Sequence, residues 1–297
     1  MAEARLVTPG VGFRAKRSWI WHIWTFSRQK PLGAVGALLL IVMVLTAIFA
    51  PAIATHDPLD MDVPNRLHAP GSEFFFGTDT FGRDQFSRIV HGARVSLYVG
   101  LISVAISTTI GTMIGIVSAY QGGRFDLMVQ RLVDIMSGIP SIVLTLALIQ
   151  ALGPSLNNVT IAIAVAFTTR TTRIARSQAL AIKQEDYVLA ARAIGASTKR
   201  IVFRHVTLNS LTPSIVVGAG LLGSAIITEA GLSFLGLGVP PPLSSWGRML
   251  QVGARGYQSI APWLTIFPGL ALTVAVFGFN LFGDALRDAL DPKLRGR

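Results

Sequence analysis

The sequence contains no cysteine and few charged residues. Without cysteine the chain can form no disulfide, no thiolate metal site and no cysteine nucleophile. Charged residues make up 14% of the 297 residues, whereas typical soluble domains carry about 25%. Hydrophobic residues make up 51%, and the mean hydropathy is +0.56. This composition predicts one membrane domain rather than two soluble domains.

Local motifs for ATP binding and for hydrolysis are also missing. No G-x4-G-K-[S/T] is present, so no sequence element is expected to cradle ATP phosphates. No H-E-x-x-H and no local Ser/His/Asp arrangement occurs. The five histidines, which all lie outside the apolar runs, are His22, His56, His68, His91 and His205. The sequence therefore predicts a protein that is not an enzyme on its own and that holds no cofactor.

Long apolar runs dominate the chain. Five of them have the roughly 20 residues that a bilayer span requires; they cover residues 33–54, 97–120, 132–152, 211–235 and 263–282. A weaker run, residues 159–167, is followed by Arg170, Arg173 and Arg176. These arginines are three residues apart and share one helix face, so we expect them to snorkel to the interface or to pack against protein.

The distribution of basic residues favours six spans over five. The net charge is +11. With six spans, 20 of the 26 lysines and arginines fall on the side of the two termini, which the positive-inside rule assigns to the cytoplasm. The basic character therefore reflects membrane topology and contact with anionic lipid. Nucleic-acid binding is a much weaker explanation of the positive charge.

Tryptophan placement agrees with this topology, because its ring favours the membrane interface. Trp19, Trp21 and Trp24 precede the first span within a basic stretch, residues 16–30, that is expected to form an interfacial helix. Trp246 and Trp263 lie in or beside the last outer loop and are expected at the opposite interface.

The most informative stretch is the inner loop of residues 184–205. Good helix formers cover residues 187–194, and Gly195 follows where a helix C-cap favours a left-handed residue. Ser197 can then cap a second short helix. Two short helices meeting at a glycine bend could dock into a groove on a partner, although an ordinary basic loop would have a similar composition.

This loop resembles the E-A-A-x3-G loop of the permeases of binding-protein-dependent ATP-driven (ABC) importers. Ala190, Ala191 and Gly195 match the motif, while Leu189 replaces the leading glutamate and Thr207-Leu208-Asn209 replaces the usual Leu-Pro. In that family the loop is the coupling helix, which sits in a cleft of the ATPase. The candidate coupling residues are Glu185, Asp186, Tyr187, Ala190, Ala191, Arg192, Gly195, Ala196, Ser197, Arg204 and His205.

Three further blocks resemble the C-type permease subunit of the dipeptide/oligopeptide/nickel branch of these importers. They are G-T-D-x2-G-R-D-x2-S-R at residues 77–88, the glycine-rich stretch from Glu229 to Gly247, and N-L-x-G-D-x-L-R-D-x-L-D-P at residues 280–292. The resemblance implies an all-α, type I importer permease of the bacterial inner membrane. Its implied partners are a homologous second permease, two ATP-binding subunits that hold ATP and Mg, and an extracytoplasmic substrate-binding protein.

The expected organisation follows from the spans and the resemblance. Residues 1–32 form a cytoplasmic tail, 33–54 the first span and 55–94 a periplasmic segment. Residues 95–284 form a five-helix permease core that contains the coupling loop, and 285–297 form a cytoplasmic tail.

Two acidic residues fall in or near apolar runs and are candidates for a gate or for a structural role. Glu229 is expected to face the protein or the outer vestibule and to order the glycine-rich bend that follows it. Asp134, near the inner end of the third span, is expected to behave similarly. The glycines and charges of residues 77–88 are expected to be turn glycines and a structural ion-pair set.

Several functions remain open at this point. Peptide import is the first choice, and a glutathione importer fits equally well. A nickel importer is an alternative because the outer segment holds loosely spaced metal-ligand types, namely His56, His68, His91, Asp57, Asp60 and Asp62. A secondary transporter independent of ATP is a different class, but it would usually show mid-membrane charges or repeated halves. A membrane-embedded hydrolase would need a nucleophile and a base inside the spans.

Overall fold

The computed structural model describes residues 28 and 30–290. The predicted interfacial helix with Trp19, Trp21 and Trp24 lies outside these described residues, as do residues 291–297 of the C-terminal tail. Within the described part, helices joined by loops make up the fold, and the only β-type pairing is an isolated bridge between Thr78 and Asp84. The all-α prediction is confirmed for this part of the chain.

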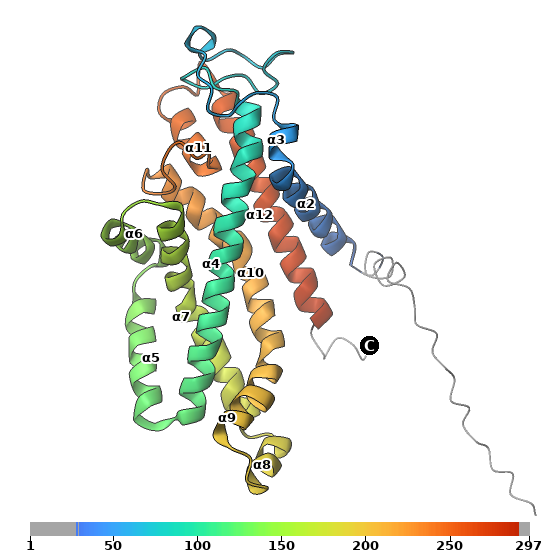
Figure 1. Ribbon diagram of the computed structural model, residues 1–297, viewed down its shortest axis with the longest axis vertical. Coiled ribbons are helices and arrows are strands. Elements are labelled where there is room, and N and C mark those ends of the chain that lie inside the picture. Colours follow the sequence, from blue (N-terminus) through green and yellow to red (C-terminus); the bar gives the residue numbers. More distant parts are fainter. Residues whose placement is uncertain (1–27, 29, 291–297) are drawn as a thin grey trace, which may run out of the picture.

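The helices follow one another along the chain in the order shown in Figure 1. They are α2 (Pro31–Ile48), α3 (Ala50–Ile53), the 3₁₀ turn η1 (Val63–Asn65), α4 (Gln85–Gln121), α5 (Gly123–Gly138), α6 (Ser141–Leu152), α7 (Leu156–Ile182), α8 (Asp186–Ala193), α9 (Thr198–Arg200), the π-helical turn η2 (Ile201–Thr207), α10 (Leu208–Phe234), α11 (Trp246–Ala254) and α12 (Trp263–Leu290). Several helices extend beyond the predicted runs: α4 begins inside the segment predicted as 55–94, and α12 continues past 284.

Four helical stretches in the described chain are long and apolar enough to cross a membrane: α2, α4, the continuous helix Thr198–Phe234, and α12. A fifth arises if α5 and α6 are counted as one span, although they are bent by 97°. The run predicted as a span at residues 132–152 is therefore divided between two helices that meet at a sharp bend. Pro140 causes the break, because its ring disfavours helical geometry at the preceding residue, and Ile139 is extended with φ −93° and ψ 128°.

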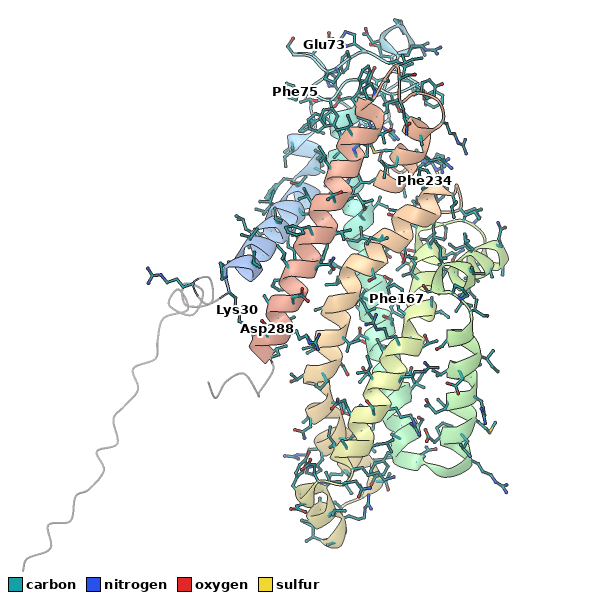
Figure 2. The ribbon with its side chains drawn as sticks, turned by 180° about the vertical axis from the view of Figure 1, so that it is seen from behind. Lys30, Glu73, Phe75, Phe167, Phe234 and Asp288 are labelled. Carbon is teal, nitrogen blue, oxygen red and sulfur yellow. The ribbon has the colours of Figure 1, made fainter. Side chains whose placement is uncertain are left out.

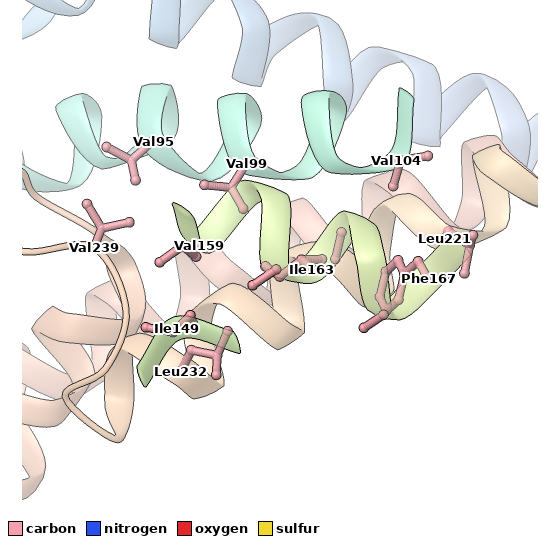
Figure 3. Packing of buried hydrophobic residues seen from close by; sticks show 13 residues of the cluster. Val95, Val99, Val104, Ile149, Val159, Ile163, Phe167, Leu221, Leu232 and Val239 are labelled. Carbon is pink, nitrogen blue, oxygen red and sulfur yellow. The ribbon is translucent and has the colours of Figure 1, made fainter. Parts of the chain in front are cut away.

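The weak run at residues 159–167 belongs to α7, a single helix of 27 residues. α7 packs along α4, and Gly111 and Gly115 of α4 leave no room there for a Cβ against Thr171 and Thr172 of α7. Figure 3 shows the core on the other part of α7, where Val159 and Ile163 meet side chains of α4, α6 and α10. Because neighbouring helices cover much of α7, polar residues are tolerated on its buried face, and its hydropathy is low.

A second core joins α2, α12, α10 and α11 to the start of α4. Trp246 belongs to this core, with 3% of its surface exposed, and its indole Nε1 donates to the Ile89 carbonyl at 3.0 Å. The Trp246 ring therefore packs inside the protein, and its predicted position at the outer interface stays a prediction. Trp263 donates to the Thr78 carbonyl at 3.1 Å and so fixes the neighbouring loop.

The two ends of the molecule differ in construction (Figure 1). Residues 55–84, here called the cap, gather with α11 at one end, and α8 and α9 lie at the opposite end. α2 begins and α12 ends part-way along the molecule, where Lys30 and Asp288 form an ion pair at 2.7 Å (Figure 2). With 37 residues, α4 is about 55 Å long, so it exceeds the roughly 30 Å hydrocarbon core of a bilayer.

Candidate coupling site

The candidate coupling loop begins with α8, which ends in the glycine cap that the sequence predicts. Gly195 has φ +81°. The Gly195 amide donates to the Arg192 carbonyl and the Ala196 amide donates to the Ala191 carbonyl, both at 3.0 Å. This pair of bonds is a Schellman motif, which requires a left-handed residue at the glycine position. A Cβ at Gly195 would meet no other atom within 4 Å, so only the backbone conformation selects glycine here.

After the bend, the chain enters the next helix through a side-chain cap. The Ser197 hydroxyl accepts from the Arg200 amide at 3.4 Å, as expected for an N-cap residue. The predicted second short helix is wrong, however, because α9, η2 and α10 form one uninterrupted helix from Thr198 to Phe234. No glycine or proline interrupts the chain between Thr198 and Thr212, so nothing in the sequence ends the helix there.

A small apolar cluster holds the loop against the ends of α4 and α7. Val188 of α8 is fully buried and belongs to the same cluster as Ile201, Val202 and Val206 of the next helix. The cluster also contains Ile116, Ala119 and Ala179 from α4 and α7. In the π turn, residues five apart align, which places both Ile201 and Val206 on the buried face. The base of the loop is therefore packed into the helical body.

Cationic side chains add a second attachment around Tyr120, near the end of α4. The Lys183 ammonium donates to the Tyr120 carbonyl at 3.0 Å and lies 5.3 Å from the centre of the Tyr120 ring. The Arg192 guanidinium lies 6.0 Å from the same ring centre. A cation near helix C-terminal carbonyls and over an aromatic face is stabilising, so the loop and the end of α4 are expected to move together.

The remaining surface of the loop is exposed. Ile194, beside the glycine bend, is 86% exposed, and Tyr187, Leu189 and Phe203 are also exposed. The centre of the Tyr187 ring lies 6.3 Å from the centre of the His205 ring. Partial burial and the nearby Glu185 charge raise the pKa of Tyr187 above its usual value, so its phenol is neutral at physiological pH. The loop thus presents an apolar tip that is ringed by charges, a shape suited to a groove on a partner.

The structure brings all the candidate coupling residues into this one loop and the first turns of the following helix. Their shared feature is a position on or beside the exposed tip. Among them, Glu185, Asp186, Arg192 and Arg204 are exposed, whereas Ala191, Ala196 and His205 are half-buried. Among the described residues, no group of three or more histidine, aspartate or glutamate side chains is arranged to hold a metal ion.

Sequence reasoning missed two ion pairs that connect α5 to α7. Arg176 binds Asp126 through two hydrogen bonds, from Nε at 2.7 Å and from Nη2 at 2.5 Å, and Ser118 donates to the same carboxylate. Arg173 binds Asp134 at 2.8 Å. The three-residue spacing of the arginines predicted a shared face that could pack against protein, but the partner carboxylates on α5 could not be identified from sequence.

Glu229, the other acidic residue predicted to act as a gate or to have a structural role, is fully buried in α10. Its Oε1 accepts from the Ser233 hydroxyl at 2.7 Å, and the same Ser233 oxygen accepts from the Val239 amide at 3.3 Å. These bonds connect α10 to the loop between α10 and α11. This geometry agrees with the expected role of Glu229 in ordering the glycine-rich bend.

The cap contains the turn glycines and ion pairs expected for residues 77–88. Gly77 and Gly82 have φ of +73° and +77°. Asp84 caps α4 by accepting from the Ser87 amide at 2.8 Å, and Asp79 pairs with Arg83 at 2.7 Å. These contacts fold the cap onto the start of α4.

These features define a helical protein with several apolar helices of membrane-spanning length, an exposed loop at one end and a folded cap at the other. Residues 111–296 match the family described as binding-protein-dependent transport system inner membrane component, and residues 18–70 match the N-terminal transmembrane domain of oligopeptide transport permease C. The chain belongs to this family of permeases, which are membrane subunits and not the ATPases of their importers.

Curated relatives agree with this assignment. The chain is 42% identical to the dipeptide transport system permease protein DppC of Alkalihalophilus pseudofirmus, over 90% of this chain and 88% of the relative. It is 44% identical to the probable D,D-dipeptide transport system permease protein DdpC of Escherichia coli, over 93% and 92% of the two chains. It is 39% identical to the glutathione transport system permease protein GsiD of Escherichia coli, over 93% and 91%.

Proposed function

We propose that this chain is one of two permeases in an ATP-driven importer that carries di- and oligopeptides across the bacterial inner membrane. The proposed topology has six spans, formed by α2, α4, the bent α5–α6 pair, α7, α10 and α12, with both termini and the coupling loop in the cytoplasm. The excess of basic residues on that side supports this orientation. The cap and the coupling loop at opposite ends of the molecule are consistent with it.

The proposed partners are a homologous second permease, two ATP-binding subunits and an extracytoplasmic binding protein. ATP and Mg would be bound by the ATP-binding subunits, because this chain has no phosphate-binding motif. The names of the relatives, which mention dipeptides and glutathione, support a small peptide as cargo. Cargo would pass between the two permeases.

The observation that carries the mechanism is the continuous helix from Thr198 to Phe234, which accommodates Pro213 in its interior. It connects the coupling loop at one end to Glu229, Ser233 and the loop held by Ser233 at the other. Movement of an ATPase against the tip at Ile194 and Gly195 would therefore rotate α10 as a rigid body and alter the opposite end. ATP binding favours one of the two states only through a difference in affinity for them.

The proposal is tested by solubilising the assembly from native membrane, identifying its subunits by mass spectrometry and measuring ATP hydrolysis. The expected result is a second permease and two ATP-binding subunits, with hydrolysis stimulated by the binding protein together with a peptide. A chain that purifies without any ATPase would contradict the proposal and would favour the transporter that works independently of ATP.

A further inference from the structure

A cavity of about 330 Å³ lies between the cap, the start of α4, the loop before α11, and α11 itself. It is at the end of the molecule opposite the coupling loop. Its volume is near the lower limit of the roughly 300–1,000 Å³ usual for small-molecule sites, so it suits a small ligand or one chemical group of a larger ligand. Here it is called the outer cavity.

The walls of the outer cavity carry a surplus of positive charge. Four arginines line it, Arg83, Arg88, Arg248 and Arg255, and Asp79 is the only acidic residue among the residues that line it. The Asp79 carboxylate is already committed to Arg83, from which it accepts at 2.8 Å, and to the backbone amides of Phe81 and Arg83. Of the other three arginines, Arg88 forms a longer ion pair with the same carboxylate at 3.6 Å, and Arg248 and Arg255 form no ion pair with any described carboxylate.

Two buried donors in the cavity wall have no acceptor. Gln85 is 1% exposed, and its side-chain Nε2 makes no hydrogen bond. Arg88 is 6% exposed; its Nη1 donates to the Pro58 carbonyl at 3.2 Å, but its Nε makes no hydrogen bond and is 3.6 Å from Asp79. Buried donors without partners are unfavourable and need an explanation. Both side chains line the same cavity, so one oxygen-bearing ligand could accept from both.

We propose that the outer cavity binds a carboxylate. This inference rests on the proposed function, which brings peptides and a binding protein to this end of the molecule. The carboxylate would be the C-terminus of the peptide cargo or an acidic side chain of the binding protein. Planar guanidinium groups match carboxylates in bidentate geometry, and the Gln85 amide supplies a further donor. Apolar wall residues such as Met61, Phe81 and Leu243 suit the carbon atoms next to the carboxylate.

A short series of hydrogen bonds connects the outer cavity to α10, so ligand binding in the cavity can affect the position of the coupling loop. Arg248 Nη1 donates to the Val239 carbonyl at 3.4 Å, and the Val239 amide donates to Ser233, which itself donates to Glu229 of α10. A carboxylate that draws Arg248 into the cavity therefore pulls on the loop that is bonded to α10. Because α10 continues into the coupling loop, ligand arrival and ATPase engagement are connected through one helix.

The direct test uses the assembly purified from membranes with its copurifying subunits but without the binding protein. Binding of radiolabelled Ala-Ala is measured and compared with that of Ala-Ala amide, which lacks the carboxylate. Arg248→Gln and Gln85→Leu should each weaken Ala-Ala binding by roughly ten-fold or more, as expected for loss of a hydrogen bond to a charged group, and leave amide binding unchanged. Arg66→Gln, on the exposed part of the cap and outside the cavity, is the matched control and should change neither.

A second measurement identifies the source of the carboxylate. If the binding protein supplies it, Arg248→Gln should raise by roughly ten-fold the concentration of copurifying binding protein that half-maximally stimulates ATP hydrolysis, and should leave Ala-Ala binding unchanged. A response in either measurement supports the site. Wild-type behaviour of Arg248→Gln and Gln85→Leu in both measurements overturns it.

A third variant distinguishes a loss of carboxylate binding from a failure to fold. Gln85→Glu places a carboxylate permanently in the outer cavity, so this variant should remain folded, with its thermal midpoint unchanged or raised, and should no longer bind Ala-Ala more tightly than Ala-Ala amide. A large fall in the midpoint overturns the proposal, because a buried glutamate without cationic partners is strongly destabilising. If ATP-driven import proceeds but no variant changes carboxylate recognition, the inference fails while the proposed function stands. If carboxylate binding depends on Arg248 but no ATPase copurifies, the carboxylate site stands and the proposed function fails.

Discussion

At the scale of single residues, the two ion pairs between α5 and α7 differ in environment. The side chains of Asp126 and Arg176 are 12% and 31% exposed, whereas those of Asp134 and Arg173 are 53% and 49% exposed. Solvent and salt screen an exposed pair, so it contributes little. Removing one partner of a more buried pair leaves the other charge without compensation. The Asp126–Arg176 pair is therefore expected to hold α5 against α7, and the Asp134–Arg173 pair is expected to add little.

This difference predicts unequal effects of the same chemical change. Asp126→Asn should lower the free energy of unfolding by about 1–3 kcal/mol, since Arg176 and Ser118 lose a charged acceptor. Asp134→Asn should change it by about 0–1 kcal/mol. Thermal unfolding of both variants in detergent checks the prediction. Equal effects, or a larger effect at Asp134, would contradict this ranking of the pairs.

At the scale of elements, the helix Thr198–Phe234 is the part of the molecule on which coupling depends. Its rigidity can be removed without altering the tip of the loop. Leu208 is 57% exposed and lies at the junction of η2 and α10, so a substitution there disturbs little packing. Proline at an interior helix position removes a backbone donor and costs about 3 kcal/mol or more, whereas alanine is a good helix former.

We therefore expect Leu208→Pro to reduce the number of peptides imported per ATP hydrolysed, while Leu208→Ala leaves this ratio unchanged. Both variants keep Ile194 and Gly195 available to the ATPase, so hydrolysis itself should continue. The ratio is measured in proteoliposomes with labelled peptide and released phosphate. An unchanged ratio in Leu208→Pro would show that α10 does not transmit the motion.

Elements also show where sequence was sufficient and where it was not. The helix C-cap at Gly195 and the helix N-cap at Ser197 were predictable, because both depend on local backbone chemistry. The break at Pro140 was predictable as a kink, but its 97° angle depends on how α6 packs against α7. The continuity of α9 with α10 was also predictable, because no glycine or proline lies between Thr198 and Thr212. The burial of Trp246 depends on tertiary contacts, which a pattern of single residues does not contain.

At the scale of the whole molecule, the proposed topology places the cap and the coupling loop on opposite sides of the membrane. The absence of cysteine makes this directly testable, since one introduced cysteine is the only thiol in the chain. Ser72→Cys in the cap should react with a membrane-impermeant maleimide in intact cells whose outer membrane has been permeabilised. Ala193→Cys at the end of α8 should react only after the inner membrane is opened. Both positions are exposed. Labelling of Ala193→Cys in cells with an intact inner membrane would contradict the orientation.

Family membership and membrane class could be read from composition and from the Ala190-Ala191-x3-Gly195 match. The outer cavity could not, because Gln85, Arg88 and Arg248 come from distant parts of the chain and only folding brings them together. The carboxylate partners of Arg173 and Arg176 were hidden for the same reason.

The central claim is that motion at the glycine bend drives import, and one measurement tests it most directly. The number of peptides imported per ATP hydrolysed is compared between Gly195→Val and Gly256→Val. Gly256 is a suitable control because it also has a positive φ, +97°, and an added Cβ there would meet no atom within 4 Å. Both substitutions strain the backbone similarly, so general instability affects both. The account predicts that Gly195→Val inserts normally and loses coupling, while Gly256→Val retains it. Normal coupling in Gly195→Val would contradict the account.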